Sequence, residues 1–325
     1  MRWLDHRLIA RKFRQKVRKF NPPDLILTAM PSYDLAYEAV LYGNQNNVPV
    51  VVDIRDQWPD LFLDNIPRSL KKVARLFLFR EFQLLERTLK GADALLSMMN
   101  VLLEWGLRRA GRQSTWKDKV FYLGYKQSTT STEKQNKIEI LRKTLDNNFV
   151  VTFIGTFGSY HDPSILVQVA RRLKNQPICF VLAGTGEYFE KVKNEAMGLE
   201  NVTLTGWLDQ SEIDALLKLS HVGICPSTRY ANFFPNKSFL YLSEGMPVVS
   251  SFQGDLKELI EQESIGLYYQ PNDDKGLADC IQMLSLDTSY YQKLSSNAKA
   301  VFNKKFDSDQ IYDTYARHLE RLIAR

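Results

Sequence analysis

Short apolar runs alternate with amphipathic helical segments in the second half of the chain, and this alternation restricts the folds that the chain can adopt. The apolar runs of strand length are 149–154, 178–183, 202–205, 222–225, 247–249 and 266–269. Segments 164–173 and 212–219 are two of the helical patterns between them. Strands that are apolar almost throughout are covered on both faces. The alternation therefore predicts a doubly wound parallel sheet with helices on both sides.

The segment 224–251 contains a candidate anion site. A buried strand ends at Pro226, and the sequence Pro-Asn-Lys at 235–237 then opens a helix that ends at Gly245. A helix N-terminus offers unpaired N–H groups and the positive end of the helix dipole. Lys237 adds a mobile positive charge in the first turn. We expect this segment to hold a phosphate or diphosphate.

Two other strands of this predicted sheet end in glycine-rich turns. Gly155 and Gly158 follow the first strand, and Gly184 and Gly186 follow the second. Each turn alone is equally well explained as a plain tight turn. Ligands of doubly wound sheets bind at the carboxyl ends of the strands. Three suitable turns in one sheet therefore favour binding of a nucleotide phosphate.

The first half predicts a smaller Rossmann-like domain that starts on a helix. Its apolar runs are 24–30, 48–54, 94–98 and 120–123, with a helix at 33–42 and a long one at 70–89. The polar, aperiodic stretch 127–137 marks a linker. We expect a partial Rossmann-like domain at 1–126, a linker at 127–147, a second Rossmann-like domain at 148–307, and a C-terminal helix at 308–325 that packs back toward the first domain.

Composition sets the remaining bounds. A chain of 325 residues is long enough for two domains. The net charge of +6 permits an anionic partner without choosing among nucleotide, lipid surface and nucleic acid. No apolar run approaches the ~20 residues that span a bilayer, and no signal peptide is visible. The three cysteines, Cys179, Cys225 and Cys280, are far apart and predict buried thiols in a reducing compartment.

The motifs together resemble the bacterial family-4 retaining glycosyltransferases of the surface-polysaccharide type. The motifs that carry the resemblance are Phe-Ile-Gly at 153–155, Leu-Ala-Gly-Thr-Gly-Glu at 182–187, Leu-Thr-Gly-Trp at 204–207, Pro-Asn-Lys at 235–237, Gly-Met-Pro-Val-Val at 245–249 and Arg-Asp-Gln-Trp-Pro at 55–59. The resemblance implies an α/β fold of two Rossmann-like domains (GT-B). The domain at 1–126 would be the acceptor-side domain, incomplete because the chain is truncated at its start, and the domain at 148–307 would bind the nucleotide sugar.

The same resemblance implies an activity. The expected enzyme is a hexosyl- or N-acetylhexosaminyltransferase that moves a sugar with retention from a nucleoside-diphosphate sugar, UDP-type favoured, to a polyprenyl-linked saccharide in O-antigen or capsule biosynthesis. The nucleotide sugar is a substrate, so neither a cofactor nor a metal is expected, and neither is nucleic acid. The expected location is the cytoplasm, with peripheral contact on the inner face of the plasma membrane.

The resemblance also assigns site residues. Lys237 would pair with the donor diphosphate as the glycosidic bond breaks, and Arg55 and Asp56 would face the sugar or acceptor, unless they form a structural ion pair. The residues expected to bind the donor are Gly155, Gly158, Gly184, Gly186, Gly206, Trp207, Arg229 and Asn236.

Several of these positions have an equally plausible structural explanation. Asn236 is as well explained as a helix cap, Arg229 as a solvated arginine, and Trp207 as a packing residue. His161 is most simply a surface histidine.

Two departures from the family pattern keep other functions open. The carboxylates of the family's E-x7-E pattern fall at Asn232 and Leu240, and leucine accepts no hydrogen bond from a ribose. The family's first strand and its Gly-rich loop do not precede the first helix. Both departures favour a non-catalytic remnant or partner subunit as the alternative. A nucleotide-sugar epimerase is a third reading, but acid and base residues for it are not evident.

Two basic amphipathic segments, 7–20 and 69–80, complete the sequence features. In the first, apolar residues recur on one side at Ile9, Phe13, Val17 and Phe20. Such segments are typical of peripheral membrane contact and also of ordinary helix packing.

Overall fold

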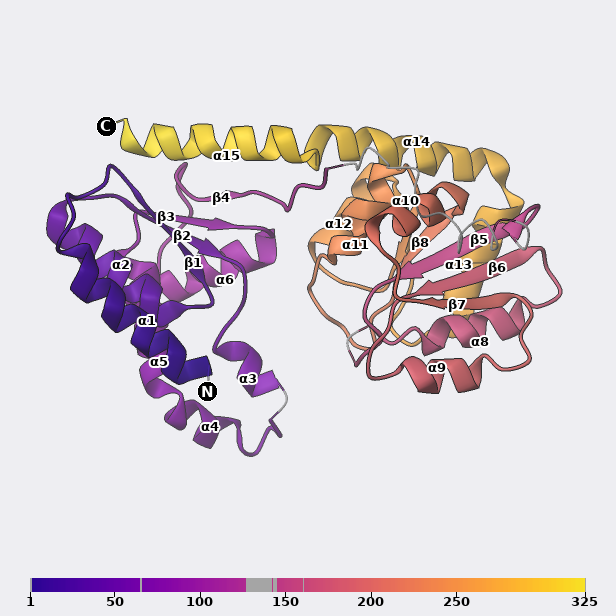
Figure 1. Cartoon of the computed structure of the whole chain (residues 1–325), viewed down its shortest axis with the longest axis horizontal. Coiled ribbons are helices and arrows are strands. Elements are labelled where there is room, and N and C mark those ends of the chain that lie inside the picture. The colour runs from indigo at the N-terminus through magenta and orange to yellow at the C-terminus, as the bar shows by residue number, and fades with distance from the viewer. Residues whose placement is uncertain (1, 65, 127–141, 143–144, 160, 325) are drawn as a thin grey trace. The chain divides into compact units, whose positions relative to one another are not determined.

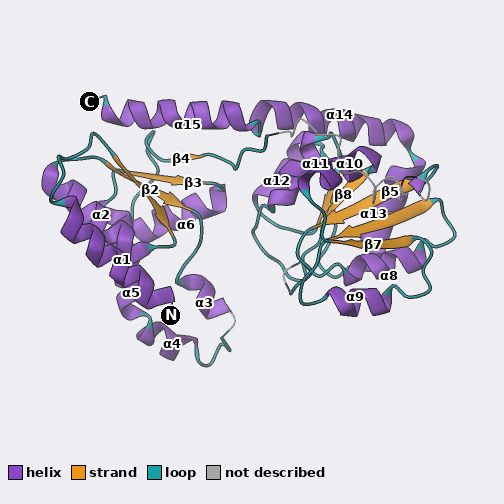
Figure 2. Cartoon of the chain, viewed as in Figure 1, coloured by secondary structure: helices purple, strands orange, loops and turns teal. Residues whose placement is uncertain are grey.

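The computed structural model describes residues 2–64, 66–126, 142, 145–159 and 161–324. Contacts divide the chain into two compact units, Met1–Leu123 with Gln310–Arg325, and Gly124–Asp309. Each unit is built on a parallel sheet with helices around it (Figures 1 and 2). The predicted linker, 127–147, lies mostly outside the described residues. In the described part of the chain, no helix is long and apolar enough to cross a membrane.

The first unit has a four-stranded parallel sheet in the order β1-β2-β3-β4. β2 has the sequence Val-Val-Val-Asp-Ile and is buried along its whole length, since β-branched residues suit a strand covered on both faces. The strands are β1 (Ile26–Met30), β2 (Val50–Ile54), β3 (Ala94–Ser97) and β4 (Lys119–Val120), and the helices are α1 (Arg2–Val17), α2 (Tyr33–Asn46), α3 (Asp60–Asp64), α4 (Lys71–Phe77), α5 (Phe79–Gly91), α6 (Asn100–Ala110) and α15 (Ser308–Ile323).

The last helix of the chain, α15, packs on the first sheet. Leu322 is buried in one cluster with Val51 and Leu96 of the sheet, and Tyr315 and Leu319 pack against the same cluster. The C-terminal helix therefore completes the core of the first unit.

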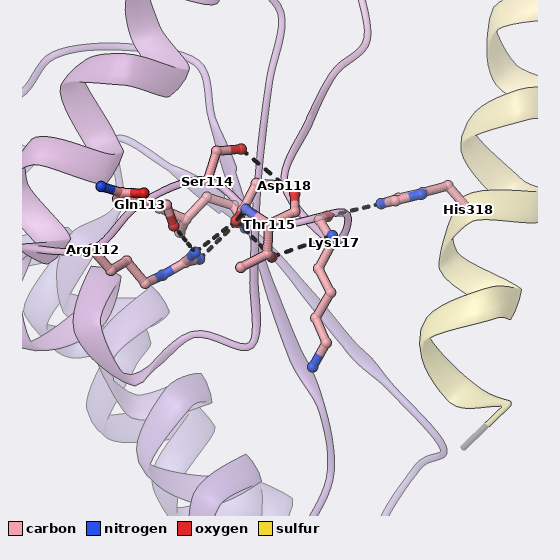
Figure 3. A network of polar contacts seen from close by, with 8 residues as sticks. Arg112, Gln113, Ser114, Thr115, Lys117, Asp118 and His318 are labelled. Carbon is pink, nitrogen blue, oxygen red and sulfur yellow. Dashed lines mark hydrogen bonds and ion pairs between the residues drawn. The ribbon is translucent and has the colours of Figure 1, made fainter.

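A buried carboxylate fixes the loop between α6 and β4 (Figure 3). Asp118 accepts both guanidinium hydrogen bonds of Arg112 at 2.6 Å. It also accepts the backbone N–H of Leu95 at 2.8 Å and that of Thr115 at 2.8 Å. Burial opposes its charge, but the Arg112 and backbone hydrogen bonds outweigh burial and lower the pKa of Asp118. His318 of α15 lies 2.9 Å from the Lys117 carbonyl oxygen, so the same loop also contacts the last helix.

The second unit has a six-stranded parallel sheet in the order β10-β9-β8-β5-β6-β7. Neighbouring residues of β5 face opposite sides: Val151 packs with α8, α9 and α13, whereas Val150 packs with α10. The strands are β5 (Phe149–Ile154), β6 (Ile178–Ala183), β7 (Val202–Gly206), β8 (Val222–Cys225), β9 (Val248–Ser250) and β10 (Gly266–Tyr268), and the helices are α8 (Ser164–Arg172), α9 (Phe189–Glu195), α10 (Gln210–Leu219), α11 (Asn236–Ser243), α12 (Asp255–Glu263), α13 (Asp274–Leu286) and α14 (Thr288–Lys305).

The predicted α/β class with two parallel sheets is confirmed, but two helices differ from expectation. The single helix predicted at 70–89 is two helices, α4 and α5, which meet at Leu78. Only α5 buries side chains, among them Phe82 and Leu85, so the chain bends where contact with the core begins. In α1, Ala10 is buried, whereas Ile9 is 50% exposed. Phe13 and Val17 of the predicted apolar side are half-buried and share the side of Ala10, so Ile9 is the position in the helix where the prediction fails.

Candidate functional site

The strand order of the second unit reverses between β5 and β8. From β5 the chain continues outward through β6 and β7, and from β8 it continues through β9 and β10. Doubly wound sheets bind ligands at the carboxyl ends of the strands beside such a reversal. Gly155 follows β5 there, and Pro226 follows β8.

Lys237 reaches this reversal from the first turn of α11. Its Nζ lies over the ring of Phe153, 3.8 Å from the centroid. Although the residue as a whole is only half-buried, Nζ is enclosed and has no hydrogen-bond partner among the described residues. Burial lowers the pKa of Lys237 to about 8. A Cβ placed on Gly155 would lie 2.8 Å from this Nζ, so the glycine leaves the space that the ammonium group occupies.

His161 lies next to Lys237 and was not among the expected site residues. Its ring centroid is 5.4 Å from that of Phe252 and 6.4 Å from that of Phe233, and its Nδ1 is buried without a recorded partner in the described structure. Burial first, and the charge of Lys237 second, lower the pKa of His161 to about 4. It is therefore neutral near pH 7 and offers a hydrogen bond, not a charge. The one signal in the sequence is its place in the loop after the first strand of the sheet.

Two of the four glycines predicted in the turns after β5 and β6 have a packing reason for being glycine. A Cβ on Gly184 would lie 1.8 Å from the carbonyl oxygen of Gly155, and one on Gly186 would lie 2.4 Å from that of Phe157. The backbones of the turns after β5 and β6 are thus in close contact. The N–H of Gly155 also donates to Ala183, so it is already engaged within the sheet. In contrast, Gly158 and Gly206 have no atom within 4 Å of such a Cβ, which leaves room beside them.

Three further expected donor-binding residues lie at the surface of the second unit. Trp207 follows β7 and is 74% exposed, so the alternative of a packing role is wrong. Asn236 is exposed and is the first residue of α11, whereas Pro235 is its N-cap, so the capping alternative is also wrong. Arg229 is exposed in the loop after β8. Their contact with a donor stays a prediction.

Arg55 and Asp56 belong to the first unit, at the carboxyl end of β2. Arg55 donates from Nε at 2.9 Å and from a terminal nitrogen at 2.7 Å to Asp53, not to Asp56. The alternative of an ion pair between Arg55 and Asp56 is therefore wrong, because Arg55 pairs with Asp53 instead. Asp56 accepts the backbone N–H of Gln57 at 2.8 Å, and burial raises the pKa of Asp56.

The two positions that depart from the family pattern differ in setting. Leu240 is buried on α11, 9% exposed. Asn232 is exposed and forms a parallel bridge with Gln253. Neither position supplies a carboxylate near α11.

The described residues contain no group of three or more His, Cys, Asp or Glu side chains that could hold a metal ion. The three cysteines are free thiols. Cys225 is fully buried, and burial raises the pKa of its thiol to about 11. Cys179 and Cys280 are only partly buried, so the expectation of three buried thiols is met fully by Cys225 alone.

The second unit matches a known family. Residues 148–287 match the model described as "Glycosyl transferases group 1". The chain is 26% identical over 168 residues to the putative colanic acid biosynthesis glycosyltransferase WcaL of Escherichia coli, an alignment that covers 49% of this chain and 41% of WcaL. An uncharacterized glycosyltransferase of Methanocaldococcus jannaschii is 23% identical over 170 residues, which cover 51% of this chain and 43% of that protein. The aligned part thus spans less than half the length of either relative.

Solved structures share the fold of the chain. HepE from Anabaena in complex with UDP has a TM-score of 0.72 and 19% identity, over 96% of this chain and 82% of HepE. HepE has also been solved with UDP-glucose. Sucrose-phosphate synthase from Thermosynechococcus elongatus has a TM-score of 0.73 and 18% identity, over 97% of this chain and 77% of that one. The fold is therefore the two-sheet α/β fold of GT-B glycosyltransferases.

Proposed function

We propose that this protein is a glycosyltransferase that transfers a sugar, with retention, from a nucleoside-diphosphate sugar of the UDP type. The observation that carries the proposal is the Lys237 ammonium, which is enclosed and without a recorded partner at the strand reversal of a group 1 glycosyl transferase domain. A buried positive charge without a counter-ion is costly. A diphosphate would supply that counter-ion. The complexes of HepE with UDP and UDP-glucose support the choice of donor.

The proposed chemistry uses positioning and charge. Lys237 and the N-terminus of α11 would stabilise the negative charge that grows on the departing diphosphate. In a retaining reaction without an enzymic nucleophile, the departing phosphate itself orients the acceptor, and the protein holds the two reactants in place. Arg55 and Asp56 are proposed to contact the sugar or the acceptor. The ion pair of Arg55 with Asp53 orients the guanidinium group, which stays half-exposed.

We further propose a polyprenyl-linked saccharide as acceptor, in the biosynthesis of a surface polysaccharide such as O-antigen or capsule. The name of WcaL, a putative colanic acid biosynthesis glycosyltransferase, supports this class of product. Such an acceptor places the protein in the cytoplasm, in peripheral contact with the inner face of the plasma membrane. A cofactor and a nucleic-acid partner have no part in this reaction.

A non-catalytic protein with the same fold is the second candidate. The observation that favours it is the burial of an apolar side chain, Leu240, where the family has a ribose-binding carboxylate. Such a protein would bind a nucleoside diphosphate weakly and would not turn over.

Calorimetry with UDP, GDP and their sugars tests donor binding, and transfer from labelled nucleotide sugars to membrane extracts tests turnover. We expect UDP to bind and at least one UDP-sugar to be consumed. Binding without turnover across the panel would favour the non-catalytic candidate. Failure of every nucleoside diphosphate to bind at millimolar concentration would overturn both.

A further inference from the structure

The helix α4 is amphipathic, yet its apolar side faces solvent. None of its residues is buried. At helical spacing, Leu70, Val73 and Phe77 share one side, and they are 54%, 52% and 83% exposed. Leu76 is 75% exposed and Phe79, at the start of α5, is 57% exposed. Isolated apolar residues on a surface are ordinary, but five large ones within ten residues mark an interaction site.

The opposite side of α4 is basic. Lys71, Lys72 and Arg75 lie there, and Arg68 precedes the helix. The segment 66–80 contains no acidic residue. No ion pair joins Arg68, Lys71 or Lys72 to a described residue. The positive charge of this surface is therefore available to a partner.

The other basic amphipathic helix, α1, is a packing element. Its Ala10 is 5% exposed. Arg7 pairs with Glu81 at 3.0 Å and Arg14 with Glu38 at 3.4 Å, so two of its basic residues are neutralised inside the first unit. In contrast, α4 has no buried residue and so is not held in the core in this way.

We propose that α4, with Leu70 and Phe79 at its two ends, is a docking surface for an anionic lipid bilayer. An amphipathic helix with a basic polar face lies in the plane of a membrane with its apolar side among the acyl chains. The basic residues at its rim complement anionic headgroups. Figure 1 shows α4 at the end of the first unit, beside α3 and α5. This docking would bring the protein to a polyprenyl-linked acceptor, and that link rests on the proposed function.

Flotation of the full chain with vesicles tests the proposal without any assay of activity. We expect binding to phosphatidylcholine vesicles that contain 30% phosphatidylglycerol, and far weaker binding to phosphatidylcholine alone. Leu76→Ser with Phe77→Ser removes the apolar contact, and we expect the partition coefficient to fall at least about tenfold. Leu286→Ser in α13 is the matched control, because Leu286 is 74% exposed on the second unit. This control should float like the unaltered protein.

A second pair of variants tests the charge. Lys71→Gln with Lys72→Gln should reduce binding to the anionic vesicles about thirtyfold, at roughly fivefold for each basic residue near the surface. Lys174→Gln with Lys193→Gln changes the net charge equally at exposed positions of the second unit, and should have little effect. Absence of binding to anionic vesicles overturns the proposal. An equal loss of binding in the Lys71/Lys72 and the Lys174/Lys193 variants overturns it too. If binding to neutral vesicles matches binding to anionic ones, the assignment of an anionic partner is wrong. Donor binding measured separately would be untouched by any of these results.

Discussion

The Nζ of Lys237 lies 3.8 Å from the centroid of the Phe153 ring, on the opposite side of the strand reversal. The face of an aromatic ring attracts a cation. This contact satisfies none of the N–H donors of the ammonium group, and no other partner is recorded among the described residues. The positive charge of Lys237 is therefore enclosed by protein, where its attraction to an anion would be stronger than in water.

Replacing Lys237 by methionine should separate phosphate binding from nucleoside binding. Lys237→Met removes a charged hydrogen-bond donor, for which ~1.5–3 kcal/mol is typical, so UDP should bind roughly ten- to a hundredfold more weakly. Uridine should bind as before. The melting temperature should stay the same or rise, because a buried charge without a partner is removed.

Lys257→Met is the control for this experiment. Lys257 also lies over an aromatic ring, 4.6 Å from the centroid of Tyr268, but it pairs with Glu261 at 3.7 Å. Its loss should leave UDP binding intact. If both variants weaken UDP binding equally, Lys237 has no special part in holding the diphosphate.

Donor binding should depend on pH through Lys237. The pKa of its amine is lowered from 10.5 to about 8 by burial. A diphosphate binds the protonated form, so the affinity for UDP should be steady near pH 7 and should fall by up to about tenfold per unit above pH 8.

The stability of the free protein should move in the opposite direction. Between the folded pKa near 8 and the ordinary value of 10.5, the unfolded chain binds more protons at this site, so the contribution of Lys237 to the free energy of unfolding rises with pH. Calorimetry from pH 7 to 9 checks that the affinity for UDP falls. Urea titrations over the same range check that the free energy of unfolding rises. If the UDP affinity of Lys237→Met changed with pH in the same way as that of the unaltered protein, Lys237 would not be the titrating group.

The sequence predicted the second sheet well because its strands are buried on both faces. Apolar runs at 149–154, 178–183 and 222–225 coincide with β5, β6 and β8. The strand–helix order then fixes where the carboxyl ends lie, and so the neighbourhood of Lys237 was predictable. Its enclosure was not, because that depends on the ring of Phe153 and on the missing Cβ of Gly155, both of which are brought to it by folding.

In the first unit, apolar periodicity alone did not predict where a helix is interrupted. The pattern over 70–89 is helical throughout, but only the second half has a core to pack on, so the chain forms α4 and α5. Similarly, the pairing of Arg55 with Asp53 joins residues at alternate positions of the chain. A strand would direct such side chains to the same face, but the neighbouring Asp56 offered an equally plausible partner from sequence alone.

Introducing a carboxylate at position 240 should strengthen the grip on the ribose. Leu240→Glu supplies the acceptor that the family pattern has, and we expect roughly tenfold tighter binding of both UDP and uridine. Leu240 is 9% exposed, so the variant should also melt at a lower temperature without ligand. Leu240→Gln, whose side chain has the shape of glutamate without the charge, is the comparison. Unchanged affinity for uridine in calorimetry would rule out a ribose site beside this position.

The buried carboxylate of Asp118 should be the most acid-sensitive support of the first unit. Its side chain is 0% exposed and pairs with Arg112. Asp118→Asn leaves that guanidinium with an uncharged partner, and loss of one member of a buried pair typically costs ~3–5 kcal/mol. Because the folded pKa is lowered, the stabilisation is present above the unfolded value of about 4 and is lost as the pH falls through the folded value.

Urea unfolding of the full chain, followed by tryptophan fluorescence, measures this effect, since Trp207 is the only tryptophan outside the first unit. Glu104→Gln is the control on the same unit. Glu104 forms an exposed pair with Arg108 at 3.6 Å, with both side chains more than 60% exposed, and such pairs contribute at most ~1 kcal/mol. We expect the urea midpoint of Asp118→Asn to fall far below that of Glu104→Gln at pH 7, and the difference between them to shrink toward pH 3. Equal midpoints at pH 7 would show that the network in Figure 3 does not support the unit.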